Sequence, residues 1–256
     1  MKIEILNDEY ARVEVESAEG TKVSKTMSLK TLVSCLRRNE ESMESSFMAP
    51  GLFKIYETQK YAIYFYLFSA RTIPFRHTDY NNPVNIYIPR VVMAFKFNKI
   101  PGTSGGNLTN TQCFLLDDGD IFNEETPMYH FPFNNYSYGY TPGICWGEAE
   151  REAVNLFKDE FNTFRFEQLY RMFFGSLFNN HLGSNGDLSS DLIRREIENS
   201  GVETDNDMLS IQNGFYEYLR QINESKTLSF CPSRIMRSSI RYQTTESMIN
   251  AVINSI

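Results

Sequence analysis

The fold class of this chain is decided by the stretch Tyr61-Ala62-Ile63-Tyr64-Phe65-Tyr66-Leu67-Phe68. The stretch is aromatic and β-rich and is bounded by polar residues, which is typical of a buried β-strand. It is the longest apolar run in the chain, and it is too short to span a bilayer as a helix. We therefore predict a strand within residues Gln59 to Ala70.

Two further segments on the C-terminal side repeat this character. Residues Val84 to Phe97 continue the pattern around Pro89, and Cys113 to Leu116 form another short apolar segment. The gaps between these segments are too short for regular crossover helices, so we predict consecutive strands of an antiparallel meander. The composition of residues 99–107 predicts a loop at a hairpin tip.

The two ends of the chain differ from this central part. Residues 2–16 alternate apolar and charged positions and predict one or two edge strands, whereas residues 28–37 open with a capping serine and predict a helix. Helical apolar spacing dominates the C-terminal half and predicts helices at Glu148 to Phe157, Phe164 to Phe178, Asp187 to Glu198, Asp207 to Ile222 and Thr244 to Ile253. Because strands come first and helices last, the predicted fold class is α+β.

Composition narrows the classes of function. The chain has 256 residues, a length typical of one large domain, and its formal net charge of −7 without a basic block predicts no nucleic-acid partner. The four cysteines form no C-x-x-C pair and the three histidines no H-x-x-x-H pair, so we expect neither a metal site nor a cofactor. The N-terminus lacks an apolar core of signal-peptide length, and we expect a cytoplasmic protein without a membrane contact.

The residues that carry chemistry gather between residues 129 and 181. Cys145 lies between Gly143 and Gly147, which predicts a loop whose backbone can approach a substrate closely. His181 can supply a base or a charge to this thiol, and Asn134 or Asn135 can donate a hydrogen bond to an oxyanion. A thiol, an imidazole and an amide are the groups that acyl-thioester chemistry needs.

Purely structural interpretations remain open at each of these positions. Cys145 beside Trp146, the only tryptophan, is also typical of a buried and inert thiol in an aromatic core. His181 follows an aromatic helix-like run, where a histidine often only complements the helix dipole. His130 lies between two aromatic residues, a pattern that favours a packed, hydrogen-bonded histidine.

Four segments, in order along residues 45–182, carry a resemblance to a known family. Residues 48–53 with 61–66, and residues 86–95, are similar to its early and central strands. Phe131-Pro132-Phe133-Asn134-Asn135-Tyr136, followed by Gly143-Ile144-Cys145-Trp146-Gly147, resembles its Pro-Phe-x-Asn-Val-Tyr and Cys-x-Gly block. Residues 173–181, Phe-Phe-Gly-Ser-Leu-Phe-Asn-Asn-His, resemble its Phe-x-x-Ser-x-Phe-(Thr/Ser)-His block. The family is the prokaryotic ubiquitin-conjugating-enzyme-like family D, which includes the B protein of PRTRC plasmid-type gene systems.

The resemblance implies a domain organisation. Residues 46–183 would form a ubiquitin-conjugating-like core, an antiparallel β-meander followed by helices. Residues 1–45 would add strands and a helix that pack on this core, and residues 184–256 would form a C-terminal helical extension. The chain departs from the family in the longer span 136–142 before the cysteine and in Asn179-Asn180, which replaces a small hydroxyl residue.

The resemblance also implies a transferase activity. Cys145 would accept a ubiquitin-like protein as a thioester from an adenylating, ThiF-like activating enzyme and pass it to an acceptor amine. Asn135 would support the oxyanion, and His181 would be the histidine that the family places after the cysteine. Asn134, His130 and Trp146 are secondary candidates, the first two because His130-x-Pro132-x-Asn134 loosely echoes the His-Pro-Asn triplet of ubiquitin-conjugating enzymes.

Two other functions stay open. A catalytically inactive binding or scaffold protein of a plasmid or mobile-element system would fit the aromatic surplus and the tyrosines at 136, 138 and 140, which we expect to be exposed. A Cys/His hydrolase is the weaker alternative, because no papain-type Gln-x-x-x-x-x-Cys lead-in precedes Cys145.

Overall fold

The fold is known from a computed structural model, which describes residues 2–6, 9–16, 22–29, 50–119, 121–133, 135–137, 143–179, 188–201, 211–225, 230–236 and 241–255. The chain divides into two compact units, Met1–Met48 and Ala49–Ile256. Most of the helix predicted over residues 28–37 lies outside the described residues. The boundaries predicted at 45/46 and 183/184 stay predictions.

The first unit contains an antiparallel sheet with the strand order β1-β2-β3. The strands are β1 (Lys2–Ile5), β2 (Tyr10–Glu16) and β3 (Lys22–Ser28). The strands predicted in residues 2–16 are confirmed, but of these only β1 is an edge strand, because β2 lies between β1 and β3. The buried centre of this sheet is small, because it consists of Ala11 and Val13 with Leu29 packed against them.

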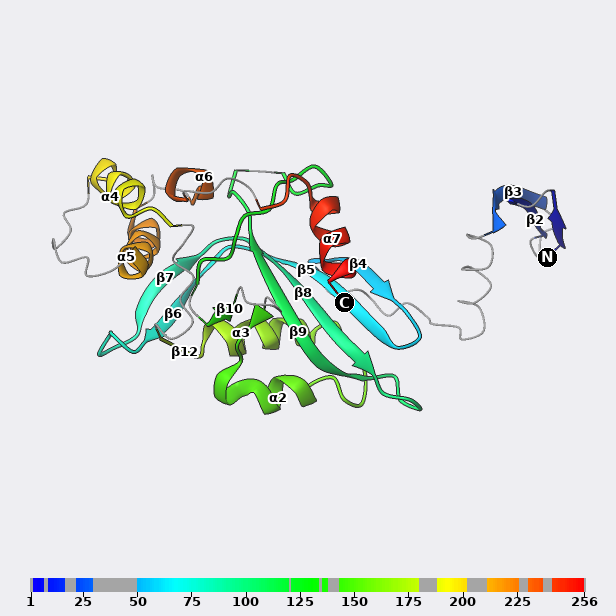
Figure 1. The fold of residues 1–256 in the computed structure, drawn as a ribbon, viewed down its shortest axis with the longest axis horizontal. Helices are drawn as coiled ribbons and strands as arrows, with labels where there is room; N and C mark the ends of the chain where they lie inside the picture. Colours follow the sequence, from blue (N-terminus) through cyan, green and yellow to red (C-terminus); the bar gives the residue numbers. More distant parts are fainter. Residues whose placement is uncertain are drawn as a thin grey trace. The chain divides into compact units, whose positions relative to one another are not determined.

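The second unit is built on a four-stranded antiparallel sheet with the order β4-β5-β8-β9 (Figure 1). Its strands are β4 (Leu52–Glu57), β5 (Tyr61–Phe68), β8 (Val91–Lys99) and β9 (Gly106–Leu115). The run that decides the fold class is β5, and β8 pairs along its whole length. The predicted hairpin tip is confirmed as the connection between β8 and β9.

A second sheet diverges from the first and has the order β12-β6-β7. It contains β6 (Arg71–His77), β7 (Val84–Ile88) and β12 (Leu177–Phe178), and β12 runs parallel to β6. The β-pattern predicted over Val84 to Phe97 divides into two strands, because β7 ends before Pro89 and joins a different sheet from β8. Proline has no N–H to continue a ladder and its φ is fixed, which suits the break. His77 is the buried last residue of β6.

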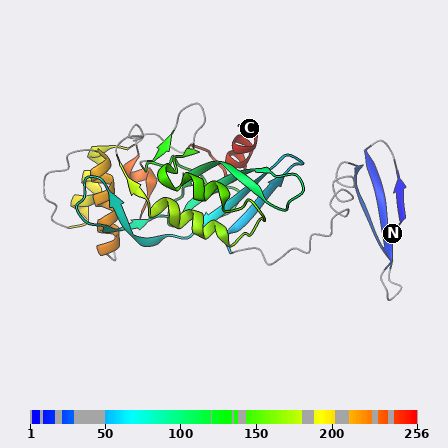
Figure 2. The ribbon, with the colours of Figure 1, turned by 90° about the horizontal axis from the view of Figure 1, so that it is seen from below.

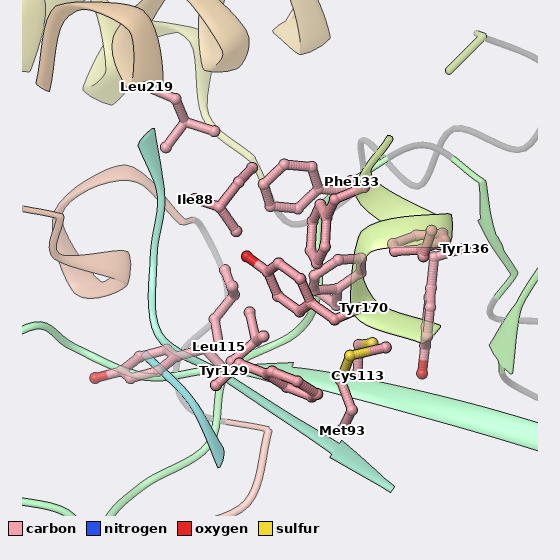
Figure 3. Close-up of a cluster of buried hydrophobic side chains, with 14 of the residues drawn as sticks. Ile88, Met93, Cys113, Leu115, Tyr129, Phe133, Tyr136, Tyr170 and Leu219 are labelled. Carbon is pink, nitrogen blue, oxygen red and sulfur yellow. The ribbon is translucent and has the colours of Figure 1, made fainter. Parts of the chain in front are cut away.

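Helices cover both faces of the main sheet. On one face lie α2 (Glu150–Asn155) and α3 (Arg165–Phe174), and on the other lies α7 (Thr245–Asn254) (Figure 1). Phe166 of α3 stacks on Phe95 at 4.8 Å between ring centroids, while Met248 of α7 is buried in the cluster on the opposite face. Figure 3 shows part of the larger cluster, in which Met93, Cys113 and Leu115 of the sheet meet Tyr170 of α3.

The remaining helices pack around the second sheet (Figure 2). They are α4 (Ser190–Asn199), α5 (Ile211–Glu224) and the short α6 (Pro232–Ile235), and α5 lies against β7. The Tyr216 ring of α5 is 4.5 Å from that of Phe75 on β6. Strands followed by helices confirm the α+β class. None of the helices in the described part of the chain has the length and apolar character needed to cross a membrane.

One helix is shorter than its pattern predicts. Residues Phe164 to Phe178 were expected to be helical throughout, but α3 ends at Phe174. The Gly175 N–H closes the last turn by donating to the Arg171 carbonyl at 2.9 Å, and the Ser176 hydroxyl donates to the Phe173 carbonyl at 2.7 Å. The aromatic run therefore crosses from a helix into β12, which brings Leu177 to the edge of the second sheet.

Candidate functional site

A two-stranded hairpin brings the predicted cysteine and asparagine together. Its strands are β10 (Tyr136–Ser137) and β11 (Gly143–Ile144), with Tyr136 opposite Ile144. Just outside this pair, the Cys145 N–H donates to the Asn135 carbonyl at 2.8 Å. The hydrogen bond fixes the backbone position of the thiol-bearing residue relative to Asn135.

Asn135 connects two walls of the site. Its φ of +64° lies in the left-handed region, which asparagine tolerates better than most side chains. Its side-chain Nδ2 donates to the Leu177 carbonyl at 3.2 Å. Because its backbone holds Cys145 and its amide holds β12, this one residue joins the hairpin to the edge of the second sheet.

The thiol of Cys145 is exposed. Trp146 follows it and lies edge-on to the Phe173 ring of α3 at 6.1 Å, so the indole anchors the loop to the core. Gly147 then takes a φ of +53°, a left-handed conformation that favours glycine, and starts the short 3₁₀ helix η1 (Gly147–Ala149) that leads into α2. The alternative of a buried thiol at Cys145 is therefore wrong.

Cys145 borders a cleft of about 520 Å³. This volume lies within the range of about 300–1,000 Å³ that is usual for ligand sites. The cleft is lined by Arg76, Asn135, Cys145, Trp146, Gly147, Glu148, Ala149, Glu152, Met172, Ser176, Leu177 and Asn179. One wall is the loop from Cys145 into α2, and the opposite wall is the segment from the end of α3 through β12.

The two walls differ in charge and share apolar surface. Glu148 and Glu152 line the cleft from η1 and α2, and Arg76 lines it from β6, where it pairs in register with Leu177. Leu177 is 50% exposed although it is a large apolar residue. An occupant that combines an apolar group with a cation would match the acidic side of this cleft.

Only part of this lining was predictable from the sequence. Cys145, Asn135 and Trp146 are brought together, whereas His181 and Asn134 lie outside the described residues. His130 is half-buried and does not line the cleft. Arg76, Glu148 and Glu152 were missed, since no sequence pattern connects a strand residue to a helix more than seventy positions away.

The other described cysteines lie in different surroundings. Cys113 is fully buried on β9, and burial raises the pKa of its thiol well above the ordinary value. Cys231 is half-buried with its sulfur 2.9 Å from the Ser233 hydroxyl, and burial again raises the thiol pKa. Cys145 is thus the exposed thiol among the three that the structure describes.

Two further expectations concern tyrosines and metals. Tyr136, expected to be exposed, is completely buried against Phe131 at 5.4 Å, and burial raises the pKa of its phenol. This removes one of the three tyrosines that suggested a binding surface, and residues 138 and 140 lie outside the described residues. Within the described ranges no group of three or more potential ligand side chains is placed to hold a metal ion.

Comparison with known proteins gives no relative. A scan against protein-family models, a search of curated proteins and a search of solved structures each found no significant match.

Proposed function

We propose that this protein is a carrier enzyme for a ubiquitin-like protein, with Cys145 as the residue that holds the thioester. The observation that carries the proposal is the exposed Cys145 thiol at the border of a cleft of about 520 Å³, with its backbone bonded to Asn135 in the same lining. The order of the Pro-Phe-x-Asn, Cys-x-Gly and Phe-x-x-Ser-x-Phe motifs supports a ubiquitin-conjugating-like core.

The proposed reaction has two balanced steps. The Cys145 thiolate attacks the thioester carbonyl carbon of the charged activating enzyme, a C–S bond forms, and the tetrahedral intermediate expels the activating enzyme's cysteine thiolate. An acceptor amine then attacks the new thioester, an amide C–N bond forms, and Cys145 leaves as a thiolate while the amine proton passes to a base. Neither step needs a metal, a cofactor or an oxidant.

Asn135 is the proposed oxyanion support. A primary amide carries two N–H hydrogens, and the hydrogen bond to the Leu177 carbonyl at 3.2 Å uses one of them. The second hydrogen can be offered to an oxyanion formed at Cys145, while the first keeps the side chain in place. A donor that is held before the reaction contributes more than one that must reorganise.

The acidic side of the cleft suits an incoming amine. Glu148 and Glu152 belong to the lining, and neither forms an ion pair with another described residue, so their charge is available to attract a lysine ammonium group. In the sequence, His181 comes two positions after Asn179, and Asn179 also lines the cleft. We propose that His181 tunes the thiol or accepts the proton of the amine.

A thioester assay tests the proposal. The protein is mixed with ATP and the ubiquitin-like protein and ThiF-like activating enzyme from the same genome, and the products are separated on a non-reducing gel. We expect an adduct that thiols cleave, that Cys145→Ser loses or converts to a thiol-resistant ester, and that Cys231→Ser keeps. Cys231 is a matched control because it is a half-buried thiol outside the cleft.

The opposite result is equally informative. If the activating enzyme becomes charged in the same tube and no adduct forms on the wild-type protein, the carrier function is wrong. The scaffold function in a plasmid or mobile-element system would then be the better explanation of the fold. Release of free ubiquitin-like protein from an amide-linked substrate, without an activating enzyme, would instead indicate a hydrolase.

A further inference from the structure

Helix α5, in the C-terminal part of the chain, contacts the segment that carries the site. Gln212, near the start of α5, is 1% exposed, and its Nε2 donates to the Pro132 carbonyl at 3.0 Å. Pro132 lies three positions before Asn135, whose carbonyl accepts the Cys145 N–H. A buried amide from the last quarter of the chain therefore bonds the same short segment that positions the thiol.

Aromatic packing reinforces this contact. The Phe133 ring, next to Pro132, is 5.3 Å from the Phe215 ring of α5 and 5.5 Å from the Phe174 ring of α3. Figure 3 shows Leu219 of α5 directed toward Ile88 and Phe133 in the same cluster. The segment 131–133 is thus enclosed between α3 and α5, and it cannot shift without disturbing both helices.

A buried amide makes this contact sensitive to substitution. Removing the Gln212 donor leaves the Pro132 carbonyl buried without that partner, and an unsatisfied buried acceptor costs more than the net value of the bond. The Gln212 Oε1 is itself buried with no hydrogen-bond partner among the described residues. The hydrogen bond that its Nε2 donates to the Pro132 carbonyl is therefore the polar contact of this side chain.

We propose that Gln212 is a positioning residue of the Cys145 site. By packing against residues 131–133, α5 then supports the cleft and is not an extension that could be removed without affecting the site. Gln212 acts through the Pro132 carbonyl on the backbone of Asn135, and through Asn135 on the Cys145 N–H. The positioning of the backbone stands on the geometry alone. Its consequence for thioester formation rests on the proposed function.

Backbone hydrogen exchange in the full-length protein measures the positioning directly. Gln212→Met removes the donor with little change in shape. We expect the amide of Cys145, followed in a peptide covering residues 143–147, to exchange about tenfold faster because its acceptor is no longer held. Gln221→Met is the control, since Gln221 is a fully buried glutamine of the same helix that donates to Glu217 Oε1 at 3.0 Å, outside the cleft lining.

Gln212→Glu gives a second measurement in case Gln212→Met does not fold. The carboxylate cannot donate, but the protonated acid can, so the exchange rate relative to wild type at the same pH should return toward one as the pH falls toward 5. An unchanged exchange rate in Gln212→Met, an equal rise in Gln221→Met, or a pH-independent ratio in Gln212→Glu would overturn the proposal.

Thioester formation separates this proposal from the proposed function. In Gln212→Met we expect the maximal rate of adduct formation to fall about tenfold or more, without a matching rise in the concentration of charged activating enzyme needed for half-maximal rate, because orientation and not binding is lost. If the wild-type protein forms no thioester, the carrier function fails while the exchange experiment still decides the role of Gln212.

Discussion

Replacing Asn135 separates its backbone role from its chemical role. Asn135→Ala removes the hydrogen bond from Nδ2 to the Leu177 carbonyl at 3.2 Å, which contributes about 1 kcal/mol. Alanine keeps a β-carbon at the φ of +64° but lacks the polar side chain that lets asparagine tolerate this region, which adds part of the about 1–2 kcal/mol cost of left-handed backbone. We expect the free energy of unfolding to fall by about 2 kcal/mol and Tm by roughly 4–8 °C.

Asn135→Gly tests how that loss is divided. Glycine loses the same hydrogen bond but adopts the left-handed conformation without strain, so we expect it to be more stable than the alanine variant by about 1 kcal/mol. Urea unfolding with an unchanged m-value measures both variants. If Asn135→Gly is as unstable as Asn135→Ala, the reasoning from backbone strain is refuted.

The same variants test the proposed oxyanion support. Loss of one oxyanion donor typically costs about 10²–10³ in rate. We therefore expect thioester formation to fall by about this factor in Asn135→Ala and Asn135→Gly alike, although their stabilities differ. Wild-type rates in Asn135→Gly would show that Asn135 only holds the backbone.

Three other predictions follow from particular contacts. Thr244→Ala removes the capping box in which the Thr244 hydroxyl accepts a hydrogen bond from the Ser247 N–H at 3.0 Å. We expect the free energy of unfolding, measured in urea, to fall by about 1 kcal/mol. No change would mean that α7 is held by packing alone. Burial, with the charges of Glu217 and Asp79, raises the pKa of Tyr80 to about 12. Its protonated form therefore stabilises the fold below pH ~10, and this contribution is lost as the pH rises toward 12. Tyr80→Phe should flatten the loss of Tm at alkaline pH, and a pH profile identical to that of the wild type would contradict this assignment. Glu152→Lys should slow discharge of the thioester onto free lysine several-fold, most strongly at low salt, whereas Glu246→Lys on α7 should not; equal effects of both substitutions would point to net charge rather than to the cleft.

The segments with a strong local pattern were predictable from sequence. The aromatic run of β5, the alternating residues of β2 and the spacing of α5 and α7 each bury one face or the whole element, so their periodicity reports on the structure directly. The loop character around Cys145 was also readable, because glycines flank the cysteine at residues 143 and 147.

Strand partners were less predictable. Val84 to Phe97 is one apolar pattern in the sequence, but β7 pairs with β6 and β8 pairs with β5. A buried strand is equally apolar toward any neighbour, so its composition does not name its partner. The strand β6 was missed because Arg71, Pro74 and Arg76 weaken its pattern, and β12 pairs with it only at Arg76 and His77.

The sequence by itself determined the α+β class, the position of the main strands and helices, and a cysteine in a glycine-flanked loop followed by an aromatic helix. Only the tertiary structure decided that Cys145 is exposed, that Asn135 joins it to Leu177, and that Arg76, Glu148 and Glu152 face one cleft. The reason is physical: periodicity encodes which face of an element is buried, whereas a cleft is assembled by contacts between segments far apart in the chain. The Gln212 contact, which joins residues 80 positions apart, is the clearest case.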